Sequence, residues 1–60
     1  MTDEVILSTD QAAELLGLSE RTLENWRWQR KGPSYVKLGR SIRYRKTDVE
    51  NWIKANIVRL

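Results

Sequence analysis

The sequence contains no cysteine and no histidine among its 60 residues, and both absences exclude chemistry. Without cysteine there is no disulfide and no thiolate metal site, and a reducing compartment is compatible with the composition. Histidine is the commonest general base and metal ligand at neutral pH, so its absence removes both roles. No other pair of nucleophile and base is visible, and the acidic residues are scattered. We therefore expect no enzyme, no catalytic residue, no metal site and no cofactor.

Long apolar runs are also missing. The longest run near the N-terminus, residues 5–7, follows two acidic residues and has the form of neither a signal peptide nor a membrane span. Proline occurs once and glycine three times, so turn signals are few and no linker divides the chain. We expect one small domain over residues 1–60 in a soluble intracellular protein without membrane contact.

Charge is unevenly distributed along the chain. Residues 1–20 hold five acidic residues and no basic one, whereas residues 21–47 hold nine Lys and Arg residues against the single acid Glu24. The net charge of the whole chain is only +3, which hides this asymmetry. A basic middle segment indicates a surface for a polyanion, and the alternative is an ordinary solvated face.

A short first helix is predicted over residues 9–16. Ser8 followed by Gln11 has the form of a capping box, in which each residue satisfies a backbone N–H of the other. Gly17 is suited to end the helix, because glycine adopts positive φ without a steric penalty.

A second helix is predicted from the Ser19 cap to about Arg30. Gly32 and Pro33 then stop it, because glycine serves as the C′ residue and proline cannot continue the hydrogen-bond ladder. The two residues that separate the helices before the Ser19 cap force a tight corner.

From residue 34 to residue 46 the apolar period changes to two, which predicts a β-hairpin. Gly39, Arg40 and Ser41 make its short loop, so that one face is apolar and the other basic. The apolar positions are Val36, Leu38, Ile42 and Tyr44, and the basic positions between them are Lys37, Arg43 and Arg45.

A third helix is predicted over residues 47–57. Thr47 and Glu50 have the spacing of a second capping box, and Val49, Trp52 and Ile53 form an apolar stripe behind it. The predicted fold class is therefore α+β and mostly α, with the order helix, helix, β-hairpin, helix.

Residues 7–31 have the spacing of a helix-turn-helix. A small residue at Ala13 lets two helices approach, Gly17 permits the corner, and Leu18, Leu23 and Trp26 fill the core between them. The alternative is an ordinary helical hairpin with a glycine corner. A hairpin with basic residues over 34–46 favours the winged form of the DNA-binding motif.

At these positions the chain resembles the small winged helix-turn-helix domains of excisionases and AlpA-like regulators, related to the DNA-binding half of MerR-type activators. The matching positions are Ala12-Ala13 with Leu15-Leu16-Gly17, Ser19 with Thr22, Leu23 and Trp26, the Gly32-Pro33 pair, Val36 with Leu38-Gly39-Arg40 and Ile42-Arg43-Tyr44, and Asp48-Val49 with Trp52. The resemblance implies a DNA-binding protein of a phage or mobile element, cytoplasmic in a bacterial host and associated with its nucleoid.

Geometry predicts which side chains of the second helix meet DNA. Leu23 and Trp26 mark its buried side, so Arg21 and Trp28 lie opposite. Arg21 can bind guanine O6 and N7 at two points, and Asn25, one turn later, can bind adenine in the same way. The predicted contacts of this helix are Glu20, Arg21, Thr22, Asn25 and Trp28.

Three of these residues have alternative roles. The indole of Trp28 packs under the hairpin or contacts sugar and phosphate through its ring. Thr22 contacts a phosphate or caps its own helix, and Glu20 accepts from cytosine N4 or serves helix capping and solubility.

The hairpin and the end of the second helix supply the predicted backbone contacts. Arg40 at the tip is placed for the minor groove or a phosphate. Arg30 falls toward the core side of the helix, where its stem can instead cover Trp26. The wing and phosphate contacts are predicted as Arg27, Lys31, Lys37, Arg40, Ser41, Arg43 and Arg45.

Three functions fit these features. The first is an excisionase, or recombination directionality factor, that binds adjacent sites and bends DNA so that an integrase excises a phage or mobile element. The second is an AlpA-like transcription regulator that occupies an operator, and the third is an interaction module for an acidic protein. No dimerisation helix follows the third helix, so we expect a monomer in solution that self-associates cooperatively on double-stranded DNA, with a site-specific integrase as a candidate partner.

Overall fold

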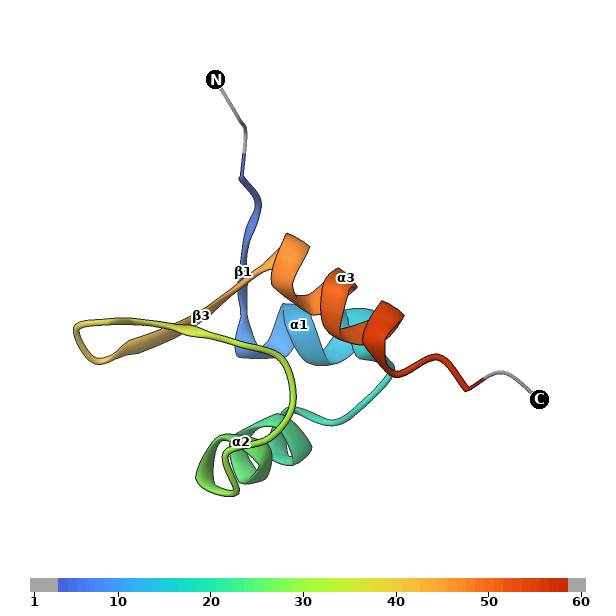
Figure 1. Cartoon of the computed structure of the whole chain (residues 1–60). Helices are drawn as coiled ribbons and strands as arrows, with labels where there is room; N and C mark the ends of the chain where they lie inside the picture. Colours follow the sequence, from blue (N-terminus) through green and yellow to red (C-terminus); the bar gives the residue numbers. More distant parts are fainter. Residues whose placement is uncertain (1–3, 59–60) are drawn as a thin grey trace.

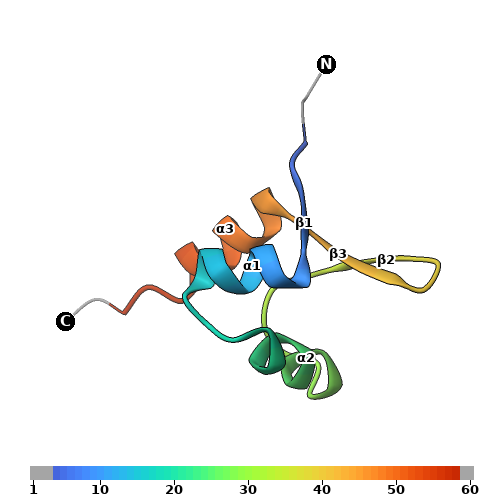
Figure 2. The same cartoon turned by 180° about the vertical axis from the view of Figure 1, so that it is seen from behind.

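The computed structural model describes residues 4–58. Along the chain, β1 (Ile6–Ser8), α1 (Thr9–Leu16), α2 (Glu20–Trp28), β2 (Val36–Leu38), β3 (Ser41–Arg45) and α3 (Lys46–Ala55) follow one another. Helices α1 and α3 lie side by side, α2 packs against α1 beyond the corner that joins them, and the β2–β3 hairpin projects away from the helices (Figures 1 and 2). This is the α+β winged helix-turn-helix fold that the sequence predicts. None of the described helices is long and apolar enough to cross a membrane.

The predicted caps of α1 and α2 are present. The backbone N–H of Ser8 donates to Gln11 Oε1 at 2.9 Å, and the N–H of Gln11 donates to Ser8 Oγ at 3.1 Å. Gly17 ends α1 with a φ of 71°, as expected of a glycine in the left-handed conformation. Ser19 Oγ accepts the backbone N–H of Thr22 at 3.1 Å and caps α2. Local signals in the sequence are therefore sufficient to begin both helices.

The end of α2 differs from the prediction. The helix ends at Trp28, two residues early, and Arg30 rather than Gly32 follows it as the left-handed residue, with a φ of 56°. The N–H groups of Arg30 and Lys31 donate to carbonyls in the last turn of α2 at 3.2 and 2.9 Å, which is the Schellman pattern. A residue with a Cβ adopts this conformation at a cost of about 1–2 kcal/mol.

Gly32 is not the C′ residue of α2 but allows the backbone to pass close to the Trp26 ring. Its φ is 89°, and a Cβ added there would lie 2.5 Å from Cε3 of Trp26. The segment after α2 therefore passes directly over the indole of Trp26, whose ring lies 5.2 Å from that of Trp52 between centroids. The cation over the Trp26 ring is Lys31, at 5.8 Å. Arg30 is exposed after the end of α2, so its predicted place on the core side of the helix is wrong.

The sheet has three antiparallel strands in the order β1-β3-β2. Strand β1 is not predicted from the sequence, because three residues are too few to show a period of two. It pairs with β3 so that Leu7 lies opposite Tyr44. The sheet thus joins the start of the chain to the hairpin, and β1 leads directly into α1.

The hairpin turn is one residue shorter than predicted. Gly39 and Arg40 form the turn, and Ser41 already belongs to β3, opposite Leu38. Gly39 has a φ of 64°, which two-residue hairpin turns require at their first central position.

This turn sets the register of the hairpin. Lys37 lies opposite Ile42, and Val36 lies opposite Arg43. Residues directly opposite each other project from the same face, and one residue of slip exchanges the faces. The expected division into an apolar and a basic face is therefore wrong. The inner face carries Leu7, Lys37, Ile42 and Tyr44, and the outer face carries Ile6, Val36, Leu38, Arg43 and Arg45.

Helix α3 follows β3 without a break. It begins at Lys46 and ends at Ala55, whereas the prediction was residues 47–57. The predicted capping box at Thr47 is wrong, because Arg45 holds the N-cap position and makes no side-chain cap hydrogen bond.

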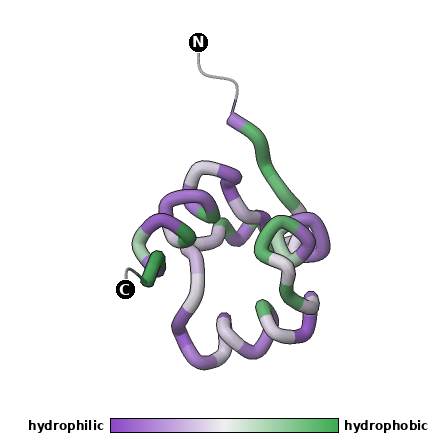
Figure 3. Tube along the Cα trace, turned by 90° about the vertical axis from the view of Figure 1, so that its right-hand side faces the viewer, coloured by the Kyte–Doolittle hydropathy of each residue, from purple (hydrophilic) through white to green (hydrophobic). Residues whose placement is uncertain are grey.

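The core lies where α1, α2, α3 and β3 meet. Two adjacent alanines of α1 allow the other elements to approach closely, as the helix-turn-helix spacing predicts. The buried residues of this core are Ala12, Ala13, Leu23, Tyr44 and Val49, with Leu7, Leu16, Trp26 and Ile42 packed against them. Hydrophobic stretches of the trace are short and alternate with hydrophilic ones (Figure 3), as expected when each element gives one or two residues to the core.

Candidate nucleic-acid interface

Helix α2 divides its residues between the core and the surface. Leu23 is 1% exposed and anchors the helix, whereas Glu20, Arg21 and Asn25 are exposed on its other sides. Trp28 is 88% exposed, so the alternative in which its indole packs under the hairpin is wrong. The outward surface of α2 therefore presents an arginine, an amide and an uncovered aromatic ring, together with the carboxylates of Glu20 and Glu24.

Thr22 is half-buried beside the cap of α2. Its Oγ1 lies 2.8 Å from Ser19 Oγ, and its backbone N–H donates to the same oxygen. The hydroxyl thus contacts the Ser19 side chain that caps the helix, and a phosphate contact by Thr22 stays a prediction.

Arg27 ties α2 to its neighbours. Its Nη1 donates to the hydroxyl of Tyr44 at 2.9 Å and to Thr9 Oγ1 at 3.4 Å. The guanidinium also lies over the ring of Tyr35, 5.8 Å from the centroid. Arg27 therefore joins α2 to α1 and β3 and packs on the face of the Tyr35 ring.

Between the C-terminal end of α2 and the hairpin lie two adjoining hollows of about 460 Å³ each. Arg27, Arg30 and Tyr35 line both. The first also includes Lys31, Gly32, Pro33 and Ser34, and the second includes Trp28, Lys37 and Ile42. We call the two hollows together the trough. Four cationic residues and no acidic residue line it, which produces a positive potential in a concave surface.

Arg40 and Ser41 lie at the far end of the hairpin, and both are exposed. Within residues 4–58, Arg40 forms no ion pair. The tip is therefore charged and accessible, as a residue that approaches a DNA groove must be.

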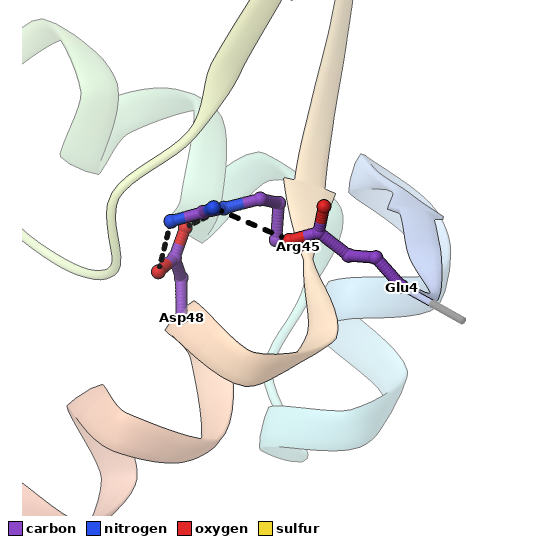
Figure 4. A network of polar contacts seen from close by, with 3 residues as sticks. All are labelled: Glu4, Arg45 and Asp48. Carbon is purple, nitrogen blue, oxygen red and sulfur yellow. Dashed lines mark hydrogen bonds and ion pairs between the residues drawn. The ribbon is translucent and has the colours of Figure 1, made fainter. Parts of the chain in front are cut away.

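The cations of the outer face are engaged by the protein itself. Arg43 is half-buried and its Nη1 donates to the carbonyl of Ile42 at 2.8 Å. Arg45 donates to both carboxylate oxygens of Asp48, at 2.7 and 2.9 Å, and its Nη1 lies 3.3 Å from Glu4 (Figure 4). The hydrogen bond and charge of Asp48, followed by the charge of Glu4, raise the pKa of Arg45 above its ordinary value. A phosphate that binds Arg45 must compete with these carboxylates.

Two residues of this surface were not among the predicted contacts. Tyr35 lies in the loop between α2 and β2, where no apolar period indicates which way a side chain points. Arg30 was predicted on the core side of α2, but the helix ends at Trp28. The described part of the chain contains no cluster of acidic residues suited to a metal ion. The trough itself is lined by cations and aromatic rings, whereas Glu20 and Glu24 are exposed on α2.

The chain was compared with known proteins. Residues 6–57, which include every helix and strand, match the family model described as a helix-turn-helix domain. No curated protein matches the chain. The matched family includes excisionase and AlpA-like proteins, in agreement with the resemblance noted in the sequence. The chain therefore belongs to this helix-turn-helix family, whose small domains bind double-stranded DNA with sequence specificity.

Proposed function

We propose that this protein is an excisionase, a recombination directionality factor that occupies adjacent DNA sites and bends the duplex to promote excision of a phage or mobile element. The observation that supports this proposal is the exposed side of α2 next to a trough that four cations and no acidic residue line, with the hairpin on its other side. Such a surface suits a duplex that is contacted along more than one groove.

In this proposal α2 enters the major groove. Arg21, exposed in its first turn, binds a guanine, and Asn25, one turn later, binds an adenine. Glu20 beside them accepts from a cytosine amino group, and Thr22 supports the first turn through its cap hydrogen bonds. These side chains supply the sequence preference.

The hairpin and trough supply contacts that do not depend on sequence. Arg40 and Ser41 approach the flanking minor groove or its phosphates, and Lys37 binds backbone near them. Arg27, Lys31 and Arg43 add to the positive potential. Arg45 contributes least, because Asp48 and Glu4 already hold its guanidinium.

A single α2 contacts few base pairs, and this favours several copies on adjacent sites. We propose that the protein is a monomer in solution, self-associates on DNA and works with a site-specific integrase inside the bacterial cytoplasm. The other candidate is an AlpA-like regulator bound at an operator, which the same surface would serve.

The test is selection from a library of genomic fragments, followed by sequencing of the bound DNA and gel analysis of permuted fragments to measure bending. Clustered direct repeats, bound cooperatively and strongly bent beside a recombinase attachment site, are the expected result. One promoter-proximal site with little bending indicates the regulator. No enrichment above nonspecific binding contradicts both and indicates the module for an acidic protein.

The role of α2 is tested by Arg21→Ala. We expect the preference at one base step to fall by about 1–3 kcal/mol, because a two-point contact to guanine is lost. Binding of the selected site and of single-base variants is measured by anisotropy. Lys54→Ala, on the exposed surface of α3, is the matched control. An unchanged preference in Arg21→Ala means that α2 is not the element that selects the sequence.

A further inference from the structure

The trough lies on the path that one DNA strand must take. If α2 occupies the major groove and the hairpin tip reaches the flanking minor groove, the sugar–phosphate strand between the two grooves crosses between these elements. Helix α2 and the hairpin enclose the trough at this place. This step rests on the proposed orientation of α2 on the duplex.

The lining of the trough matches the chemistry of such a strand. Phosphates are anionic, and four cations line the trough without an acidic neighbour. Deoxyribose is apolar at its ring carbons, and Trp28, at 88% exposure, offers an aromatic surface that no described residue covers. Tyr35, at 44% exposure, lies beside it above Arg27. The cations of the trough thus match the phosphates of a DNA strand, and its aromatic rings match the sugars between them.

The backbone at Arg30 gives an independent indication. Arg30 adopts a left-handed conformation that glycine would adopt without strain, and its side chain lines both hollows. Backbone strain of this kind concentrates at functional positions. The conformation places a cation at the centre of the trough, where glycine would place none.

The register of the hairpin places Lys37 in the trough as well. Lys37 lies opposite Ile42 on the inner face, and both line the hollow that contains Trp28. Arg27 is already bound to Tyr44 and Thr9, so Arg30 and Lys37 are the cations of this hollow without such partners among the described residues.

We propose that the trough holds one sugar–phosphate strand of the bound duplex, with Arg30 and Lys37 on neighbouring phosphates and the Trp28 ring against the deoxyribose between them. Trp28 and Arg30 are then positioning residues that set how the duplex lies on α2, and neither selects a base.

The charged and apolar contacts of the trough are distinguished by their salt dependence. Arg30→Gly should lower the slope of log affinity against log salt by about 1, because one phosphate contact is lost. Trp28→Ala should weaken binding by about fivefold to tenfold on every duplex without changing that slope. Trp28→Phe should restore part of the affinity.

The experiment is anisotropy of a labelled duplex at several salt concentrations, together with acrylamide quenching of tryptophan fluorescence. Trp28 is exposed, whereas Trp26 and Trp52 are half-buried against each other, so Trp28 dominates the quenching. We expect the duplex to protect this fluorescence in the wild type and not in Trp28→Phe. Circular dichroism verifies that the variants fold, and Lys54→Ala is the control for loss of one exposed cation.

Wild-type affinity in both Trp28→Ala and Arg30→Gly, with quenching that the duplex does not change, overturns the proposal. The Arg21→Ala variant reports base preference and therefore tests the role of α2 separately. The proposal for the trough can be contradicted while the proposed DNA-binding function is supported. A single-stranded oligomer of equal length that binds as tightly as the duplex and protects Trp28 equally also overturns it, because the trough would then hold an unpaired strand.

Discussion

The two faces of the sheet both carry cations, but their electrostatic surroundings differ. On the inner face Lys37 shares the trough with Arg30 and no carboxylate. On the outer face Arg45 is bound by Asp48 and lies within 3.3 Å of Glu4. Lysine and arginine residues of the same hairpin therefore differ in whether they are free to bind a phosphate. The number of cations in a segment does not locate a phosphate-binding surface, whereas strand register and neighbouring carboxylates do.

The largest effect is expected at Gly32, which lines the trough and lies against the Trp26 ring. Gly32→Ala should destabilise the fold by about 2–4 kcal/mol, because the new Cβ meets the Trp26 ring at 2.5 Å and the φ of 89° disfavours a side chain. Urea unfolding measures the change. Gly17→Ala is the matched control, with a φ of 71° and nothing within 4 Å of the new Cβ, and should cost about 1 kcal/mol. Equal losses would show that the contact with Trp26 contributes nothing.

A charge reversal in the trough tests the inner face directly. Lys37→Glu should weaken binding of all duplexes by about tenfold to a hundredfold, because it introduces a carboxylate where phosphates must bind. Anisotropy at low and high salt measures the effect, which should shrink as salt screens the repulsion. A loss confined to one sequence would instead indicate that Lys37 contacts a base.

The local parts of the fold are predictable from the sequence. Ser8, Gln11, Gly17 and Ser19 determine the ends of α1 and the start of α2, because each acts on backbone groups within four residues. The order of helices and hairpin follows from the change of apolar period. The exposed side of α2 is likewise predictable, since Leu23 and Trp26 mark its buried side.

The sheet register is less predictable. Gly39 is compatible with a turn of two or of three residues, and one residue decides which face receives Lys37. Similarly, Gly32 offered a plausible end for α2, yet Arg30 takes the left-handed position. The trough results from both differences, so its residues could not be grouped from the sequence.

Replacing Arg30 by glycine should change the stability of the fold and the affinity for DNA in opposite directions. Arg30→Gly should stabilise the fold by about 0.5–1 kcal/mol, because the φ of 56° is free of strain for glycine but its extra unfolded-state entropy offsets part of the gain. The same variant should bind DNA more weakly. Thermal unfolding and anisotropy on one preparation measure both, and a loss of stability would mean that the Arg30 side chain supports the fold.

The smallest effect is expected on the outer face, at Arg45. Arg45→Ala should reduce DNA affinity less than Lys37→Ala, because Asp48 and Glu4 already neutralise the guanidinium. These acids raise the pKa of Arg45, and a base with a raised pKa in the folded state keeps its stabilising charge until the pH exceeds the ordinary arginine value. The pair therefore persists across neutral pH, and mutation is the way to break it. Asp48→Ala is the informative partner, because it removes two hydrogen bonds from the Arg45 guanidinium and leaves only Glu4 as its carboxylate neighbour among the described residues. Affinity should therefore rise slightly. An affinity unchanged in both variants would place the outer face away from the DNA.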